Sequence, residues 1–105
     1  SSTPDRTLEA PNREERRRCW KARDEFLACL EANKIDVFGI TAESTAASEP
    51  TSGACGKLEL AMRKACPAAW ASYFITRQQI EKRLAEQRTA IEQREREANA
   101  AAAAA

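Results

Sequence analysis

Two segments, CWKARDEFLAC at residues 19–29 and CGKLELAMRKAC at residues 55–66, contain all four cysteines of the chain. Each segment opens and closes with a cysteine, and most of the residues between are good helix formers. On a helix, steps of ten and eleven residues separate the two cysteines by about 15 and 16.5 Å. A disulfide requires Cα atoms roughly 4.4–6.8 Å apart, so neither helix can close a bond on itself. Disulfides must therefore run between the two helices.

The nearly equal spacings allow two antiparallel helices to form both bonds at once. Cys29 then meets Cys55 beside the connecting loop, and Cys19 meets Cys66 at the open end. The other cross-pairing, Cys19 with Cys55, needs parallel helices, which a small hairpin rarely adopts. A zinc site is a less favoured alternative, because structural zinc sites usually draw cysteines from short knuckles. We expect an all-α fold, a disulfide-stapled antiparallel helical hairpin with a longer C-terminal helix.

Composition excludes several classes of function. The 105-residue chain is only 6% aromatic, so its small core should depend on staples that contribute roughly 3–4 kcal/mol each. The 17 basic and 16 acidic residues nearly cancel, which argues against a nucleic-acid partner. No apolar run approaches the ~20 residues of a membrane span, so we expect none, and we do not expect the polar start to act as a secretory signal. Without histidine or a phosphate-binding loop, we expect no enzyme, beyond weak thiol–disulfide exchange.

The pattern of apolar residues and the positions of turn-forming residues divide the chain into three parts. Residues 1–11 are predicted to be a disordered N-terminal lead-in, residues 12–98 a single domain, and residues 99–105 an Ala-rich tail. Within the domain we expect helices over residues 12–33, 54–66 and 68–98, and a loop over residues 34–53. Asn12 can cap the first helix, and Pro67 should interrupt the chain before the last.

The segments CWKARDEFLACLEAN (19–33) and CPAAWASYFITR (66–77) resemble those of coiled-coil-helix-coiled-coil-helix (CHCH) proteins of the mitochondrial intermembrane space. A C-x(9)-C segment followed by C-x(10)-C is similar to two related families, cytochrome c oxidase subunit VIb and cytochrome c oxidase assembly factor 6. The Cys-Trp-x-x-Arg-Asp-x-aromatic-x-x-Cys-Leu and Cys-Pro-x-x-Trp-x-x-Tyr-Phe patterns favour the second family. The similarity covers about residues 16–90, and the connection between the twin segments is long for the family.

The resemblance implies an assembly factor for cytochrome c oxidase in the mitochondrial intermembrane space, oxidised on import by the disulfide relay. It would assist the dinuclear copper centre of subunit II together with Sco-type copper chaperones. Thiol–disulfide exchange and transport of Cu(I) on thiolates, which soft copper favours, are both possible mechanisms. No cofactor would be tightly bound and no metal would bind the oxidised form, with Cu(I) binding only after reduction. The alternative is a structural CHCH subunit of the oxidase, similar to subunit VIb.

Charge distinguishes the two cysteine pairs. Nearby cations lower the pKa of a thiol and favour the reactive thiolate. Cations flank Cys19 and Cys66, whereas Cys29 and Cys55 have no adjacent charge. The flanking residues are Arg16, Arg17, Arg18, Lys21, Arg63 and Lys64. We therefore take Cys19 and Cys66 as the redox or Cu(I) candidates, against the alternative that both pairs are inert staples.

Large aromatic side chains form the candidate partner surface. Two short helices cannot cover all of them, so we expect a partner or a homodimer to do so. For the two tryptophans, packing at the open end of the hairpin is the alternative. The residues of this surface are Trp20, Phe26, Trp70 and Phe74.

Overall fold

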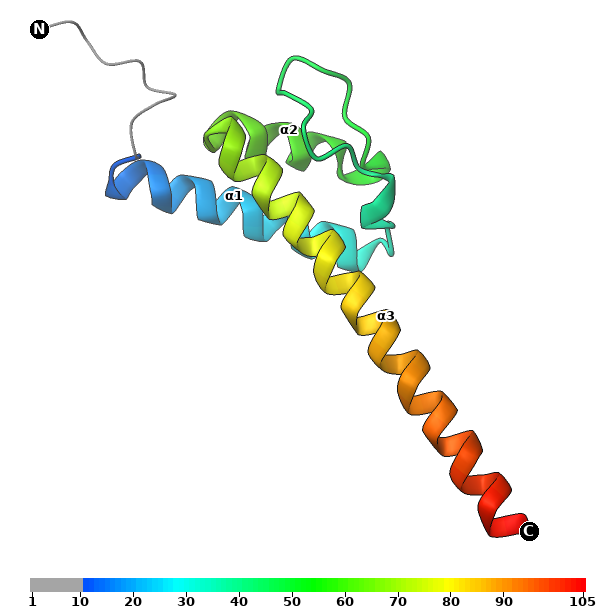
Figure 1. The fold of residues 1–105 in the computed structure, drawn as a ribbon. Coiled ribbons are helices and arrows are strands. Elements are labelled where there is room, and N and C mark those ends of the chain that lie inside the picture. The colour runs from blue at the N-terminus through cyan, green and yellow to red at the C-terminus, as the bar shows by residue number, and fades with distance from the viewer. Residues whose placement is uncertain (1–10) are drawn as a thin grey trace, which may run out of the picture.

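The computed structural model describes residues 11–105, and the described part contains helices and no strand. The predicted all-α fold is confirmed. The lead-in expected over residues 1–11 lies outside the described residues, except for Pro11. The elements in chain order are α1 (Arg13–Ala32), η1 (Val37–Gly39), η2 (Gly53–Cys55), α2 (Gly56–Ala65) and α3 (Ala68–Ala104), where η marks a short 3-10 helix (Figure 1).

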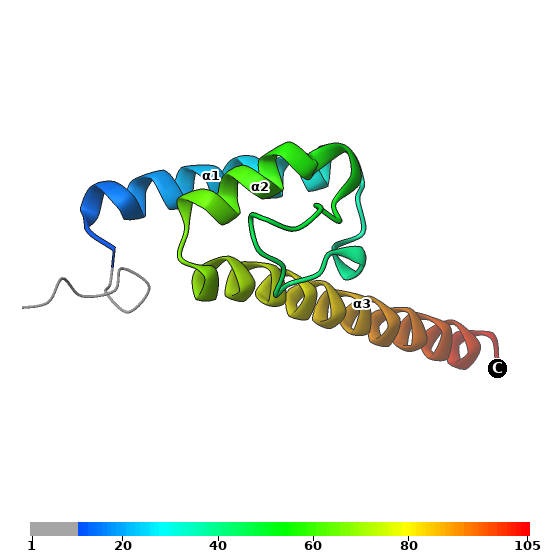
Figure 2. The same cartoon turned by 90° about the horizontal axis from the view of Figure 1, so that it is seen from above.

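Helices α1 and α2 lie side by side as an antiparallel hairpin, and α3 crosses them on one side (Figures 1 and 2). The long connection between α1 and α2 folds back into the space between α2 and α3 (Figure 2). The end of α3 projects beyond this body, which gives the molecule extents of 77 × 30 × 20 Å. None of the described helices is long and apolar enough to cross a membrane. The structure therefore has two parts. The stapled head consists of α1, the connecting loop, α2 and α3 up to residue 83, and the projecting end is the rest of α3.

Polar side chains and backbone geometry set the two ends of α1. At the start, the Asn12 side chain accepts a hydrogen bond from the Glu15 backbone N–H at 2.8 Å, as expected for a cap. At the end, Lys34 adopts a positive φ of 54°. The Lys34 N–H then bonds the Glu31 carbonyl at 3.2 Å, and the Ile35 N–H bonds the Leu30 carbonyl at 2.9 Å. This is a Schellman ending, which turns the chain sharply out of α1.

Pro67 separates α2 from α3. Helix α2 ends at Ala65, Pro67 has a φ of −55°, and its carbonyl accepts the first hydrogen bonds of α3 from Trp70 and Ala71, each at 3.0 Å. The last helix was expected over residues 68–98, but α3 continues to Ala104. The Ala-rich tail therefore extends the helix, because alanine has the highest helix propensity of all residues.

The core lies where α1, α2 and the first half of α3 meet. The face of α1 that carries Cys19, Phe26 and Leu30 is directed to this core, and Met62 of α2 and Cys66 just after α2 are buried in it. Phe26 is 0% exposed in it, so its assignment to a partner surface was wrong. Its helical spacing from Cys19 and Leu30 puts it on the buried face of α1. The buried apolar residues are Cys19, Phe26, Leu30, Val37, Ile40, Cys55, Met62, Cys66, Ala71 and Ile75.

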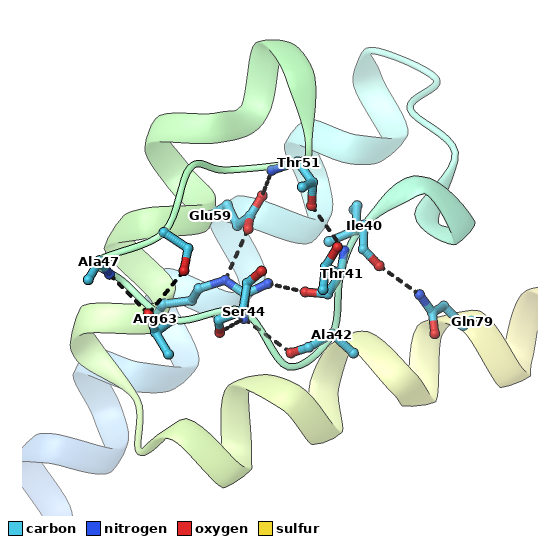
Figure 3. A network of polar contacts seen from close by, with 11 residues as sticks. Ile40, Thr41, Ala42, Ser44, Ala47, Thr51, Glu59, Arg63 and Gln79 are labelled. Carbon is cyan, nitrogen blue, oxygen red and sulfur yellow. Dashed lines mark hydrogen bonds and ion pairs between the residues drawn. The ribbon is translucent and has the colours of Figure 1, made fainter.

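A buried ion pair on α2 holds the connecting loop in place (Figure 3). Arg63 Nε donates to Glu59 Oε2 at 3.0 Å, and the two side chains are 2% and 1% exposed. The other Arg63 nitrogens donate to the carbonyl oxygens of Thr41, Ala42 and Ser44. A guanidinium has five donors in a fixed fork, so one side chain can bind both a carboxylate and several loop carbonyls.

Further contacts complete the attachment of the loop. Glu59 Oε1 accepts from the Thr51 backbone N–H at 3.0 Å. From α3, the Gln79 amide donates to the carbonyl oxygens of Val37 and Ile40 at 3.0 and 3.1 Å. Gly56 is buried at the start of α2, and a Cβ there would lie 3.0 Å from the Pro50 ring. The loop is therefore fixed to both α2 and α3 by these polar contacts, in addition to Val37 and Ile40, which it contributes to the core.

Candidate redox site: the two disulfides

Two disulfides join α1 to the chain segment of α2, one at each end of the hairpin. The outer disulfide, Cys19–Cys66, has an S–S distance of 2.11 Å and a Cα–Cα distance of 4.8 Å. The inner disulfide, Cys29–Cys55, has corresponding distances of 2.04 and 5.9 Å. These are the two pairs that antiparallel helices require. Ten residues of α1 separate the two bonds by about 15 Å, so the four sulfurs do not converge as a zinc site would need.

The outer disulfide is enclosed in the core. Cys19 is 0% and Cys66 6% exposed, which shields both sulfurs from an external thiol. Arg63, one of the cations expected to activate this pair, binds Glu59 and the connecting loop instead of the disulfide. The remaining flanking cations extend toward solvent, apart from the partly buried Arg16, which donates to the Pro11 carbonyl at 3.1 Å. Burial therefore opposes the reactivity that the charge pattern suggested.

The inner disulfide lies in a polar and more open setting. Cys29 is partly exposed, whereas Cys55 is buried at the start of α2. Asn33, the C-terminal cap of α1, places its side-chain amide beside the bond. Its Nδ2 donates to the Cys29 carbonyl at 2.9 Å and lies 3.4 Å from Cys29 Sγ and 3.8 Å from Cys55 Sγ. The i,i+4 spacing of Cys29 and Asn33 was the sequence signal for this contact.

The structure separates the aromatic residues that the sequence grouped. Trp20 is 44% exposed on α1, while Trp70 and Phe74 are partly buried on α3. The Trp70 and Phe74 rings meet edge to face with centroids 6.4 Å apart, and the Arg23 guanidinium lies 5.2 Å from the centroid of Phe74. Trp20, Trp70 and Phe74 therefore remain available in part for a partner, and Phe26 does not.

A polar cluster around Asp36 and Lys82 connects η1 to α3. Asp36 accepts from the Phe38 backbone N–H at 3.0 Å and pairs with Lys82 at the same distance. The Phe38 hydrogen bond and, after it, Lys82 hold the pKa of Asp36 below its ordinary value of 3.8. Lys82 and Arg83 also lie 5.3 and 5.7 Å from the centroid of the Phe38 ring. This cluster marks the point beyond which α3 has no further buried residue.

The thiol groups of the chain are those of the two cysteine pairs. Among residues 11–105, no group of three or more His, Cys, Asp and Glu side chains is arranged to hold a metal ion. A reduced cysteine pair offers two thiolates, and thiolates select soft ions such as Cu(I). The four cysteine sulfurs do not converge on one point, as a four-ligand zinc site would require.

Comparison with known proteins identifies relatives of the chain. The sequence model of the family described as cytochrome oxidase c subunit VIb matches residues 8–90. Three proteins named cytochrome c oxidase assembly factor 6 homolog align over 67 residues, or 64% of this chain. Identity is 33% to the Bos taurus protein, 36% to the Homo sapiens protein and 31% to the Mus musculus protein.

The aligned stretch is only part of each relative. It spans 66% of the length of the Bos taurus and Mus musculus proteins and 42% of the Homo sapiens protein. No solved structure matches the chain significantly.

Proposed function

Since the chain belongs to the cytochrome oxidase c subunit VIb family, we propose that it is an assembly factor for cytochrome c oxidase in mitochondria. The observation that carries this proposal is the set of relatives named cytochrome c oxidase assembly factor 6 homolog, which align with 67 residues of this chain. Two disulfides in a small fold suit an oxidising compartment, which supports the intermembrane space as its location and the disulfide relay as its oxidant on import.

The proposed step is maturation of the dinuclear copper centre of subunit II, together with Sco-type copper chaperones. Cysteine pairs are the groups in this chain that can exchange electrons with other thiols or carry Cu(I) as cargo. In thiol–disulfide exchange, one pair would pass two electrons to or from a partner's cysteines. In copper transport, a reduced pair would hold Cu(I) between two thiolates. Cys19 and Cys66 remain the proposed Cu(I) pair, and their burial requires that the hairpin open before copper enters.

A genetic experiment tests the assembly role. Deleting the gene should lower the amount of active oxidase and of copper in its subunit II, and re-expressing the chain should restore both. A variant with both Cys19 and Cys66 replaced by Ser is the control for a cysteine-dependent role. Normal oxidase levels in the deleted cells would reject the proposal.

The alternative is a stoichiometric structural subunit of the oxidase, and the family description favours it as the second candidate. The two roles differ in where the chain resides after assembly. An assembly factor should be absent from purified mature oxidase or present in far less than equimolar amount. Equimolar retention would establish the subunit role instead.

The two copper mechanisms differ in whether the chain binds the metal. Anaerobic titration of the reduced protein with Cu(I), in competition with a chelator of known affinity, measures this directly. Tight binding of one Cu(I), lost when Cys19 and Cys66 are replaced by Ser, would support transport. Binding no tighter than in that variant would leave thiol exchange as the mechanism.

We also propose that the chain forms a homodimer through α1 and the region around Trp70. Trp20 and Tyr73 are 44% and 54% exposed, which leaves aromatic surface for a second copy to cover. Light scattering at high micromolar concentration should detect the dimer, and Trp20→Ala should weaken it. Only monomer at that concentration would remove the proposal.

A further inference from the structure

Exposure distinguishes Cys29 from the other three cysteines, and Cys29 is not one of the two that cations flank in the sequence. Cys19, Cys55 and Cys66 are 0%, 1% and 6% exposed, and Cys29 is the partly exposed member of the set. A thiolate breaks a disulfide by attacking one of its sulfurs, so an external thiol must first reach that sulfur. Cys29 is therefore the cysteine of the folded protein that offers an external thiol the most exposed approach.

The Asn33 amide lies against the bond that this attack would break. The same Nδ2 donates to the Cys29 carbonyl at 2.9 Å, which requires the NH₂ end of the amide at this position. One N–H is thereby directed to the carbonyl, and the other is available to Cys29 Sγ at 3.4 Å and Cys55 Sγ at 3.8 Å. A sulfur in a disulfide is a weak acceptor and a thiolate is a strong one, so this contact strengthens as the bond breaks.

Cys55 is placed to be the leaving thiolate. It is the N-cap residue of α2, and its side chain makes no capping hydrogen bond in the disulfide form. The dipole at a helix N-terminus stabilises a thiolate and lowers the pKa of a thiol there. A thiol of lower pKa is also the better leaving group in exchange. The acidic residue of this first turn, Glu59, is already paired with Arg63.

We propose that the inner disulfide is a thiol–disulfide exchange site, with Cys29 as the attacked sulfur, Cys55 as the leaving thiolate and Asn33 as its hydrogen-bond donor. The co-reactant is a protein dithiol whose two cysteines can form a disulfide of their own. This inference deepens the proposed function and rests on it for the identity of that dithiol in the cell. The chemistry itself depends only on the residues around the bond.

The reaction balances as a two-electron exchange. A partner thiolate attacks Cys29 Sγ, the Cys29–Cys55 bond breaks, and its electron pair passes to Cys55 Sγ. The partner is then joined to Cys29 by a mixed disulfide. The partner's second thiolate then attacks the partner sulfur that is bonded to Cys29. This closes a disulfide within the partner and releases Cys29 as a thiolate. The two new thiolates take protons from water, and the reverse sequence reduces a partner disulfide.

Graded reduction with dithiothreitol, followed by alkylation and mass spectrometry, tests the site in the full chain. Cys29 and Cys55 should be labelled before Cys19 and Cys66. The monothiol glutathione should be trapped on Cys29, with Cys55 left as the free thiol. Labelling of the outer pair first, simultaneous labelling of all four cysteines, or glutathione on Cys55 would overturn the proposal.

Variants of Asn33 separate a chemical role from a structural one. Asn33→Ala should slow opening of the inner bond about fivefold, the fold-change for ~1 kcal/mol of lost hydrogen bonding. Asn33→Asp, of nearly the same shape, removes the donor and adds a negative charge, so it should slow opening further. Asn12→Ala removes the cap at the other end of α1 and should leave the rate unchanged.

The direction of the change in opening rate in Asn33→Ala distinguishes a chemical role from a structural one. A purely structural role for Asn33 predicts faster opening, because a frayed helix exposes the bond. An equal or faster rate in Asn33→Ala therefore overturns the role of Asn33. These measurements use dithiothreitol and glutathione, so they do not depend on oxidase assembly. Exchange at the inner bond together with normal oxidase in cells lacking the chain would reject the proposed function and retain this site.

Discussion

The stapled head and the projecting end of α3 are both helical, but different interactions hold them. The head contains the core, the two disulfides and the buried Glu59–Arg63 pair. From residue 84 onward every residue of α3 is exposed. This part of the helix projects away from α1 and α2 (Figure 1). In that part the ion pair of Arg96 with Glu92 is 3.9 Å long and exposed, and Gln93 donates to Glu97 at 3.0 Å.

The difference shows that helix formation and tertiary stability have separate origins in this chain. Alanine, glutamate, glutamine and arginine favour a helix by propensity, and i,i+4 pairs add only ~0.2–0.5 kcal/mol each. The head has few large apolar residues, so covalent bonds and a buried ion pair supplement its core. Substitutions should therefore have large effects on the stability of the head and small effects on that of the projecting end.

The largest effect is expected where one buried charge is removed from the head. Arg63→Met leaves the Glu59 carboxylate buried without its partner and releases the loop carbonyls, which should lower the free energy of unfolding by ~3–5 kcal/mol. Urea denaturation followed by circular dichroism measures this change. Lys64→Met, at the exposed neighbouring position, is the control and should stay within ~0.5 kcal/mol of the parent. Similar effects of the two variants would refute the stabilising role of the pair.

Removing either disulfide should have the next largest effect. The loops closed by the outer and inner bonds span 47 and 26 residues. The chain-entropy relation then predicts losses of ~4 kcal/mol for the double Ala variant of Cys19 and Cys66, and ~3.5 kcal/mol for that of Cys29 and Cys55. The same urea denaturation compares the two variants. A loss below ~1 kcal/mol for either variant would show that the corresponding bond is not a staple.

Two isoleucines of the same helix provide a matched comparison between the regions. Ile75 is 1% exposed in the head and Ile91 is 49% exposed on the projecting end. Ile75→Ala should lower the free energy of unfolding by ~2–5 kcal/mol, whereas Ile91→Ala should change it by less than ~0.5 kcal/mol. Thermal denaturation at two protein concentrations sharpens the test. A concentration-dependent loss in Ile91→Ala would show that a second copy covers this part of α3.

The smallest effect is expected at the turn that leaves α1. Lys34 has a φ of 54°, a conformation that costs a residue with a Cβ roughly 1–2 kcal/mol and costs glycine little. Lys34→Gly should therefore raise the free energy of unfolding by ~0.5–1 kcal/mol. Lys21→Gly, in the middle of α1, should lower it by about 1 kcal/mol. Effects of the same sign in the two variants would contradict this interpretation.

The helices and the cysteine pairing could be predicted because both follow from local rules. Asn12 is a strong cap, Pro67 cannot continue a helix, and the cysteine spacing restricts which bonds two helices can form. The boundary expected at residue 98 was less accurate, since alanines continue a helix without any tertiary contact. Predictions made from propensity and covalent geometry agree with the structure closely.

The candidate site depended on interactions between distant segments, and there the predictions were weaker. Cations flank Cys19 and Cys66 in sequence, but Arg63 points to a loop about twenty residues away in the chain. Phe26 was assigned to a partner surface because two short helices were not expected to cover all the large aromatic side chains, but the packing of the core buries it completely. The spacing of Asn33 from Cys29 was visible in the sequence, but only the fold brings Cys55 of another element beside the same amide.

The sequence by itself determined the helices, the antiparallel pairing and the family, since these depend on spacing and on residue types within short segments. Only the tertiary structure decided which disulfide is enclosed and which is accessible. The physical reason is that burial depends on segments that lie far apart in the chain: Cys19 and Cys66 belong to the core that α1, α2 and α3 form together, whereas Cys29 stays partly exposed near the end of α1. Helical periodicity shows which side chains share a face, but the segment packed against that face decides whether water reaches it.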